Sequence, residues 1–356
     1  MTGRIERLRE RLTLDDKTCA VVSREVNLFY LTGFTGSSAV LYVDGQQAVL
    51  LTDFRYLQQA KSQVPAGVRV LDHESRVADI LRSLLPGDMR RAGFESKDSH
   101  LFWKTLRAMA RPAGVRLFEL DDALLDMRTR KDPGEVEQIR RAAAIADEAF
   151  GFLLEEIRPG MTENHLALAL EFFMRQKGAS GLSFPTIMAS GSRSALPHGT
   201  SSDKIIEFGD LLVMDYGCVV NRYCSDMTRT VAVGDITSRQ QAVYETVLEA
   251  QEEALLLVRP GISVRELDAR ARQVIDGAGY GPFFGHALGH GVGLEIHELP
   301  AVSSRTGTIL EEGMVITIEP GVYLEGSGGV RIEDLVLVTA TGGERLSRSP
   351  KELVIL

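Results

Sequence analysis

The first part of the chain alternates short hydrophobic runs with segments of helical periodicity. The apolar runs Ala39–Val43 and Ala48–Thr52 flank Asp44-Gly45, a dipeptide typical of a tight β-hairpin. Two further runs, Cys19–Ser23 and Val115–Leu120, have the length and composition of buried strands. Apolar positions at helical spacing predict three helices between these strands, at Tyr56–Gln63, Val77–Leu85 and Leu101–Met109. The pattern predicts a small α/β unit.

A polar stretch, Asp126–Lys131, interrupts this pattern. The sequence Asp132-Pro133-Gly134-Glu135 follows it and has the features of a helix start. Asp132 suits the N-cap, Pro133 suits the first helical position, and Glu135 can return a capping-box hydrogen bond. We therefore predict a domain boundary here, with one domain at residues 1–127 and a second at residues 132–356.

The second domain contains an internal repeat. A helix, an Arg-Pro-Gly tripeptide and a second capped helix occur at Arg158-Pro159-Gly160 and again at Arg259-Pro260-Gly261. The strands that follow align as well, and Asp215 in one copy matches Glu319 in the other. The next strands are expected to carry Asp226 and Glu333. The repeat predicts one domain made of two related halves, each of which supplies two carboxylates.

Composition narrows the class of protein. The chain has 356 residues, which favours two domains, and its formal net charge of −9 argues against a nucleic-acid partner or an anionic membrane. The 3 cysteines form no CxxC pair and predict no disulfide framework. No secretory signal and no apolar run of membrane-spanning length is recognisable. We expect a reduced, cytoplasmic protein with no membrane association.

Histidines add candidate chemistry to the carboxylates. His286, His290 and His297 fall within one glycine-punctuated segment, and His198 lies in Leu196-Pro197-His198-Gly199. A hairpin would bring Asp215 and Asp226 together, and such carboxylates repel unless a cation lies between them. A lone acidic residue at a strand end is more commonly a turn residue. Four of them at related positions, beside clustered histidines, indicate a metal site.

The ligand types limit the metal. One imidazole and four carboxylates suit Mn²⁺, Co²⁺, Fe²⁺ or Zn²⁺ rather than a thiolate-preferring ion. Four carboxylates exceed what one ion needs and suit two ions roughly 3.5–4 Å apart, with shared carboxylates and hydrolytic chemistry. We expect two divalent ions, Mn²⁺ first, with Co²⁺ or Zn²⁺ as alternatives.

Two motifs are similar to those of a known family. The segment from His290 to His297-Glu-Leu-Pro300, together with Glu319-Pro320-Gly321, resembles the pita-bread metallopeptidases, which include methionine aminopeptidase, aminopeptidase P, prolidase and creatinase. The likeness covers essentially the whole chain. It implies a small α/β creatinase-type N-terminal domain and a pseudo-twofold pita-bread catalytic domain, with a curved mixed β-sheet flanked by helices. The extra N-terminal domain points to the Xaa-Pro-specific branch.

The resemblance implies a role for each metal ligand. Asp215 would chelate one ion, and Asp226 and Glu333 would bridge both ions. His290 and Glu319 would hold the second ion. Glu319 would also take a proton from the attacking water. Creatinase lacks these ligands, and their presence here argues against a metal-free hydrolase.

The resemblance also implies substrate contacts. His198 and His297 would hydrogen-bond the substrate and stabilise the oxyanion. His286, Arg331 and Tyr323 would line the substrate pocket or orient the ligands.

The sequence leaves the length of the substrate open. A cation that reads the carboxylate after proline would favour Xaa-Pro dipeptides, and Arg55 is a candidate for it, although a surface arginine near a helix start is the plainer interpretation. We expect an Xaa-Pro dipeptidase (prolidase), with aminopeptidase P, acting on longer peptides, as the alternative. A non-catalytic pita-bread binding protein is a distant third. The family resemblance also implies a homodimer.

Overall fold

A computed structural model describes residues 3–74 and 77–356 of the chain. The chain divides into two compact units, Met1–Arg128 and Thr129–Leu356. Each unit has its own sheets, helices and buried core, and each is described by itself below. Across the described residues, no helix combines the length and apolar content needed to cross a bilayer.

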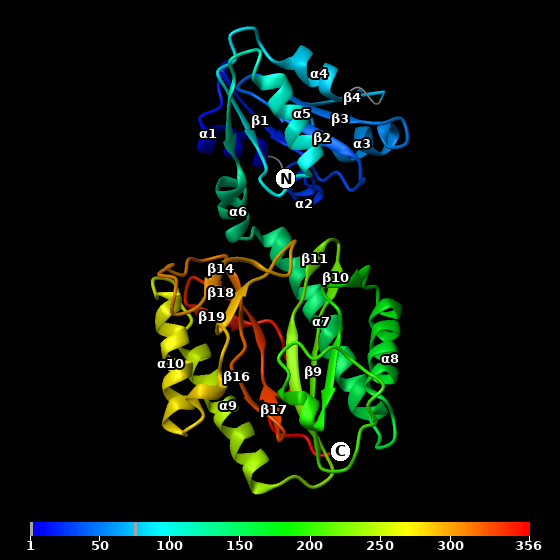
Figure 1. Cartoon of the computed structure of the whole chain (residues 1–356), viewed down its shortest axis with the longest axis vertical. Coiled ribbons are helices and arrows are strands. Elements are labelled where there is room, and N and C mark those ends of the chain that lie inside the picture. The colour runs from blue at the N-terminus through cyan, green and yellow to red at the C-terminus, as the bar shows by residue number, and fades with distance from the viewer. Residues whose placement is uncertain (1–2, 75–76) are drawn as a thin grey trace. The chain divides into compact units, whose positions relative to one another are not determined.

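The N-terminal unit is a six-stranded mixed sheet with helices (Figure 1). The strand order is β4-β3-β2-β1-β5-β6, with antiparallel pairs β1–β2 and β2–β3 and parallel pairs β1–β5, β3–β4 and β5–β6. The strands are β1 (Thr18–Val22), β2 (Ala39–Val43), β3 (Ala48–Thr52), β4 (Val68–Asp72), β5 (Arg91–Phe94) and β6 (Arg116–Glu119). The helices are α1 (Arg4–Leu12), α2 (Glu25–Thr32), α3 (Leu57–Gln63), α4 (Val77–Leu84), α5 (His100–Ala110) and α6 (Asp121–Thr129).

The hairpin predicted at Asp44-Gly45 forms between β2 and β3. Val43 pairs with Ala48, and the Asp44 carboxylate accepts hydrogen bonds from the backbone N–H groups of Gln46 and Gln47, both at 2.8 Å. An aspartate that bonds the backbone two and three residues on is a common way to close such a turn. The strands and helices expected in this unit from the hydrophobic pattern lie within one or two residues of their observed bounds.

The C-terminal unit is built from two similar halves. The first half has α7 (Pro133–Glu156), α8 (Glu163–Gln176), β7 (Gly181–Leu182), β8 (Ile187–Ser190), the 3₁₀ turn η1 (Gly191–Ala195), β9 (Asp210–Tyr216), β10 (Cys218–Val220), β11 (Tyr223–Cys224) and β12 (Met227–Val233). The second has α9 (Ser238–Leu256), α10 (Val264–Gly277), η2 (Gly281–Phe283), β13 (Gly289–Gly291), β14 (Glu298–Val302), β15 (Val315–Ile318), β16 (Gly321–Leu324), β17 (Gly328–Arg331), β18 (Asp334–Thr339) and β19 (Gly342–Arg345). Figure 1 shows α9 and α10 on one side of the strands and α8 on the other.

The two halves repeat one another in detail. Sheet β12-β9-β8 belongs to the first half and sheet β14-β13-β15-β18-β19 to the second. Isolated β-bridges Thr162↔Ile205 and Ser263↔Ile309 join the start of the second helix of each half to the segment before its central strand. One hydrophobic core lies against α7 and α8 and another against α9 and α10. The predicted duplication and the mixed α/β class are confirmed.

Helix starts in this unit follow the predicted chemistry. Asp132 caps α7 by accepting from the Glu135 backbone N–H at 2.9 Å, and Glu135 returns a bond to the Asp132 N–H at 2.9 Å. Ser263 and Glu266 form the corresponding box at α10. Capping satisfies backbone donors that the first turn leaves without helical partners.

Three local expectations were wrong. The polar stretch Asp126–Lys131 does not break the structure at its start, because α6 continues to Thr129. Asp226 does not lie on a strand but in the two-residue gap between β11 and β12. The region around Glu333 is not one continuous strand, because β17 ends at Arg331 and β18 begins at Asp334. In both site regions the carboxylate occupies a break between strands, where its side chain is not confined to one face of a sheet.

Candidate metal centre and active site

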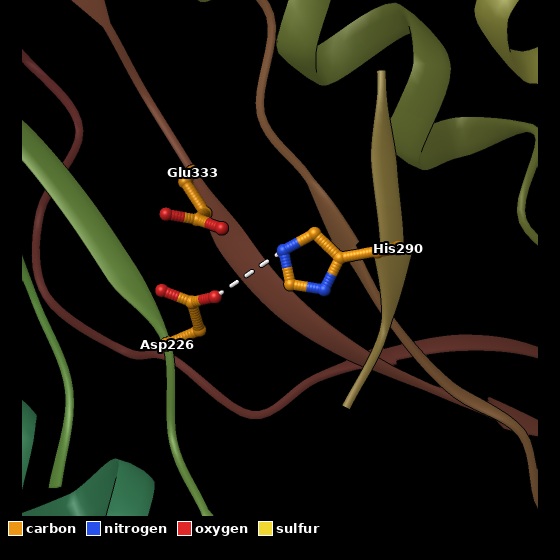
Figure 2. Close-up of side chains that lie close together, drawn as sticks. All are labelled: Asp226, His290 and Glu333. Atoms are coloured by element: carbon orange, nitrogen blue, oxygen red, sulfur yellow. Dashed lines mark ion pairs between the residues drawn. The ribbon is translucent and has the colours of Figure 1, made fainter. Parts of the chain in front are cut away.

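Three ligand-type side chains converge where the two halves of the C-terminal unit meet. Asp226, His290 and Glu333 each offer a ligand atom, and these atoms all lie within 4.8 Å of one another. Figure 2 shows the three side chains pointing toward a common point. The His290 Nε2 atom lies 3.5 Å from Asp226 Oδ2. Asp226 precedes β12, Glu333 precedes β18 and His290 lies on β13, so both halves of the repeat contribute.

Glu319 joins this group from the end of β15. Its Oε1 atom lies 3.4 Å from His290 Nε2. The Thr317 hydroxyl donates to Glu319 Oε1 at 3.1 Å and accepts from the His290 backbone N–H at 3.1 Å. Thr317 therefore fixes the glutamate and the histidine strand relative to each other.

Asp215 stands at the corresponding place at the end of β9, held by Arg331. The Arg331 Nη2 group donates to Asp215 Oδ2 at 2.5 Å. The other oxygen, Asp215 Oδ1, is buried and has no hydrogen-bond partner among the described residues. Buried polar atoms are nearly always satisfied in folded proteins. A carboxylate oxygen left in this way, facing a cavity of acidic side chains, is suited to a cation.

Arg331 links several parts of the site. Its guanidinium also donates to Tyr323 Oη at 2.9 Å, to the Pro197 carbonyl at 3.2 Å and to Thr228 Oγ1 at 3.2 Å. The Thr228 hydroxyl in turn donates to Glu333 Oε2 at 2.7 Å. One buried arginine thus contacts Asp215 directly and Glu333 through the Thr228 hydroxyl, which fixes the two carboxylates relative to each other.

Burial and mutual repulsion dominate the electrostatics. Burial first, and the neighbouring Glu333 and Asp215 charges second, hold the pKa of Asp226 well above its usual range. Burial followed by the charges of Glu319 and Asp215 does the same to the pKa of Glu333. Burial raises the pKa of Glu319 to about 7. These shifts mean that the protein lacks enough positive charge of its own to keep the carboxylates ionised.

The imidazoles are kept neutral. Burial lowers the pKa of His290 and of His297, and it lowers the pKa of His286 to about 4. Neutral imidazole is the form that binds metals. The His290 Nδ1 atom lies 3.1 Å from the Gly291 carbonyl, which favours a proton on Nδ1 and leaves Nε2 facing the carboxylates.

The other predicted histidines surround this centre. The ring of His297 packs edge-on against that of His290, with centroids 4.4 Å apart. The Nε2 atom of His286 lies 3.0 Å from Tyr323 Oη. His198, His286 and His297 line the same cavity of about 490 Å³ as the carboxylates. The cavity also has an apolar wall of Phe184, Pro185, Ile187, Pro197 and Ile296.

A second cavity adjoins the first. It has a volume of about 560 Å³ and shares His286 and Ala287 with the cavity that holds the carboxylates. Arg272 and Arg305 line it, together with Ser303 and Ser304. Arg272 pairs with Asp268 at 2.7 Å. Sequence reasoning did not single out Arg305, since an arginine in a polar loop carries no periodicity or motif signal.

Two glycines allow the backbone of β13 to lie where it does. A Cβ atom on Gly289 would lie 2.1 Å from the Thr317 carbonyl oxygen, and one on Gly291 would lie 2.2 Å from the Leu299 carbonyl oxygen. Both obstacles are backbone atoms of neighbouring strands. The glycines on either side of His290 are therefore required for the close approach that places its ring.

The donor set fits divalent metal. Four carboxylates and one neutral imidazole gather in one cavity, with one buried carboxylate oxygen unsatisfied and the others held partly by threonine hydroxyls. Oxygen and imidazole donors suit first-row divalent ions. The residues that could hold such ions are Asp215, Asp226, His290, Glu319 and Glu333.

Comparison with known families agrees with this chemistry. Residues 137–340 match the family model described as metallopeptidase family M24. The chain belongs to metallopeptidase family M24. Residues 4–129 match the creatinase/prolidase N-terminal domain. The resemblance inferred from the two sequence motifs is confirmed, and the chain is by family a metal-dependent peptidase.

Proteins similar to this M24 chain include Xaa-Pro dipeptidases and an X-Pro aminopeptidase. The Xaa-Pro dipeptidase of Pyrococcus furiosus is 40% identical over 356 residues, which cover 99% of this chain and 100% of the relative. The structure of an Xaa-Pro dipeptidase from Bacillus anthracis matches with a TM-score of 0.94 at 40% identity, covering 99% of each chain. That of an X-Pro aminopeptidase from Thermotoga maritima matches with a TM-score of 0.90 at 39% identity, covering 98% of this chain and 100% of the other.

Arg55 is the predicted site residue that belongs to the N-terminal unit. Its side chain is largely exposed and binds Asp53 through two hydrogen bonds of 2.8 Å. Its assignment to the substrate site stays a prediction. The threonines Thr228 and Thr317 were missed, because a hydroxyl that bonds a ligand cannot be told from any other threonine in a strand before the pairing is known.

Proposed function

We propose that this chain is a dinuclear-metal hydrolase that cleaves the Xaa-Pro peptide bond, with Xaa-Pro dipeptides as its preferred substrates. The observation that carries the hydrolase assignment is the convergence of Asp226, His290 and Glu333 within 4.8 Å, beside Asp215 and Glu319 in one cavity. The names of full-length relatives at about 40% identity support proline as the second residue of the substrate. The catalytic chemistry is assigned to residues 132–356, and residues 1–127 form the creatinase-like domain.

The assignment of the five donors to two ions is the one that the resemblance to the family implies, and their gathering in one cavity supports it. Asp215 would hold one ion, His290 and Glu319 the other, and Asp226 and Glu333 both. Two divalent ions would supply Lewis acidity and an activated water. Mn²⁺ is our first choice, and Co²⁺ or Zn²⁺ are alternatives, because oxygen-rich sites with one imidazole accept all three.

The chain's own residues would position the substrate and move its protons. Glu319, whose pKa burial raises to about 7, is suited to accept a proton from the attacking water and to return it to the leaving amine. His198 and His297 lie on the cavity wall as donors for the oxyanion that forms at the scissile carbonyl. Arg331 holds Asp215 in place through the hydrogen bond that its Nη2 group donates to Asp215 Oδ2.

The preference for dipeptides requires a cation that binds the proline carboxylate. Arg305, in the cavity that shares His286 with the catalytic cavity, offers such a cation within the same compact unit. Arg55 remains the second candidate, and Asp53 already engages its guanidinium. An arginine fork discriminates strongly between a terminal carboxylate and a continuing peptide.

Aminopeptidase P activity is the second candidate. The chain is 39% identical to the Thermotoga maritima X-Pro aminopeptidase, and this supports aminopeptidase P activity nearly as well as the 40% identity to Xaa-Pro dipeptidases supports dipeptidase activity. A non-catalytic binding protein is disfavoured, because a chain without catalysis has no need for five metal-type donors. A homodimer in the cytoplasm stays our prediction from the sequence.

The experiment is a substrate comparison on Mn²⁺-loaded protein with Ala-Pro, Ala-Pro-Ala and Met-Ala-Ala. We expect kcat/KM to be highest for Ala-Pro. A higher value for Ala-Pro-Ala would favour aminopeptidase P. Cleavage of Met-Ala-Ala in preference to both would overturn the Xaa-Pro assignment.

A further inference from the structure

A buried ion pair lies at the turn that precedes His297. Lys131 Nζ is 3.1 Å from Glu298 Oε2, and the two side chains are 1% and 2% exposed. Taking both charges out of water is costly, and a buried pair of this kind is poor support for overall stability. Lys131 also lies in a stretch whose sequence is that of a polar linker. Its burial therefore calls for a local explanation.

Glu298 shapes the turn that presents His297. Its other oxygen, Oε1, accepts from the backbone N–H groups of Leu294 at 3.0 Å and Glu295 at 3.2 Å. The side chain thereby closes the turn that precedes His297. A Cβ atom on Gly293 would lie 2.5 Å from Glu298 Oε2, so this glycine leaves room for the carboxylate.

The same carboxylate lies close to the metal-type histidine. Glu298 is the first residue of β14 and pairs with Gly291, the residue after His290, at a β-bulge. His290 and His297 contact each other through their rings. A shift of Glu298 would therefore displace its neighbour His297, whose ring contacts that of His290.

Lys131 is anchored on the rigid part of the catalytic unit. Its backbone N–H donates to the Gly313 carbonyl at 2.8 Å, and Arg130 forms a β-bridge with Met314, just before β15. The next residue, Asp132, caps α7. The ammonium group thus joins this anchored segment to the turn that precedes His297.

We propose that Lys131 and Glu298 are positioning residues, which hold the 294–298 turn so that His297 faces the substrate. The proposal rests on the function proposed above for His297. The ion pair between Arg130 and Glu311 provides a matched control, because Arg130 is the residue before Lys131. Its Nη1 atom lies 2.9 Å from Glu311 Oε2, but the two side chains are 64% and 55% exposed. Exposed pairs of this kind contribute little.

The kinetic test compares Lys131→Met with Arg130→Met on Ala-Pro. We expect kcat/KM to fall about 10- to 100-fold in Lys131→Met, as for other residues that orient a site, and to change less than about twofold in Arg130→Met. The double variant Lys131→Met/Glu298→Gln should recover much of the loss, because it removes the buried negative charge that faced Lys131 and keeps an acceptor for the two amides. Equal kinetics in Lys131→Met and Arg130→Met would overturn the proposal.

A double-mutant cycle separates positioning from general destabilisation. In a His297→Ala background, Lys131→Met should lower kcat/KM less than about twofold, because its effect passes through a side chain already removed. If Lys131→Met lowers kcat/KM by the same factor with and without His297, Lys131 acts independently of His297 and the proposal is overturned.

Amide hydrogen exchange on chelator-treated protein gives a readout that needs no activity. Lys131→Met should speed exchange at Leu294 and Glu295, and Arg130→Met should leave it unchanged. Unchanged exchange in both variants would overturn the proposal. Failure of the wild type to cleave Ala-Pro would instead refute the proposed function, while the exchange comparison would still decide the role of the ion pair.

Discussion

Arg331 donates to Asp215 Oδ2 at 2.5 Å, and the other aspartate oxygen, Oδ1, has no hydrogen-bond partner among the described residues. The arginine is 4% exposed, and three more of its N–H groups donate to Tyr323, Thr228 and the Pro197 carbonyl. Asp215 lines the same cavity as Asp226, Glu319 and Glu333. If Asp215 holds a metal ion as proposed, a side chain that is not itself a ligand orients it.

Replacing Arg331 by lysine should therefore impair the site although the charge is kept. Lysine has no planar fork and cannot reach Asp215, Tyr323 and Thr228 together. We expect a loss of about 10- to 100-fold in metal affinity or in kcat/KM. Metal titration and Ala-Pro kinetics would measure it. Arg140→Lys, which alters a surface pair with Glu344, is the control. Equal effects in the two variants would contradict this account of Arg331.

Gly291→Ala should disturb β13, the strand that carries His290, far more than Gly285→Ala does. Its Cβ atom would meet the Leu299 carbonyl oxygen at 2.2 Å, whereas one on Gly285 would have nothing within 4 Å. We expect Gly291→Ala to lower the free energy of unfolding by about 1–3 kcal/mol and to reduce metal binding. Gly285→Ala should be neutral or slightly stabilising. Urea titrations of both variants would test the contrast, which fails if their midpoints coincide.

Metal-free protein should lose stability as the pH rises through the acidic-to-neutral range. Glu319 has an ordinary pKa of 4.5, which burial raises to about 7 in the fold. Between these values the folded state binds more protons than the unfolded state, so the free energy of unfolding falls with increasing pH. Asp226 and Glu333, whose pKa values are also raised, act in the same direction.

Thermal melts of chelator-treated protein from about pH 5 to pH 7 would measure this dependence. Divalent metal should reverse it, because metal displaces protons from its ligands and binds more tightly at higher pH. A metal-free melting temperature that rises over this range would contradict the assigned carboxylate environment.

The two candidate carboxylate-binding arginines can be separated directly. Arg305→Ala should lower the ratio of Ala-Pro to Ala-Pro-Ala turnover by about 10- to 100-fold, the loss expected for a hydrogen bond between charged groups. Arg55→Ala should leave the ratio unchanged if Arg305 binds the carboxylate. A changed ratio in Arg55→Ala alone would return that role to the N-terminal unit. No change in either variant would remove the physical basis for dipeptide preference.

Much of the fold followed from local patterns. The Asp44-Gly45 hairpin and the Asp132 capping box depend on residues a few positions apart, so their chemistry is visible in the sequence. The internal repeat relates Asp215 to Glu319 and Asp226 to Glu333 without any structure. The breaks between strands at Asp226 and Glu333 were not foreseen, because a run of β-forming residues does not show where the chain leaves one sheet for another.

Contacts between distant segments could not be derived in this way. The Thr317 bond to Glu319 and the Lys131–Glu298 pair depend on strand pairing and on how the chain turns, and neither leaves a spacing signal in the sequence. Lys131 illustrates the limit. Its polar neighbours indicate an exposed linker, yet its side chain is buried. Hydrophobicity patterns assign a charged residue to the surface unless its partner is known.

The most direct test of the central claim is a metal titration of chelator-treated protein with Mn²⁺, following Ala-Pro hydrolysis and bound metal together. We expect no turnover without metal, and full turnover when about two ions are bound per chain, as a dinuclear site requires. Asp226→Ala and Glu319→Ala proteins should stay folded and inactive throughout the titration. Full activity in metal-free protein would contradict it.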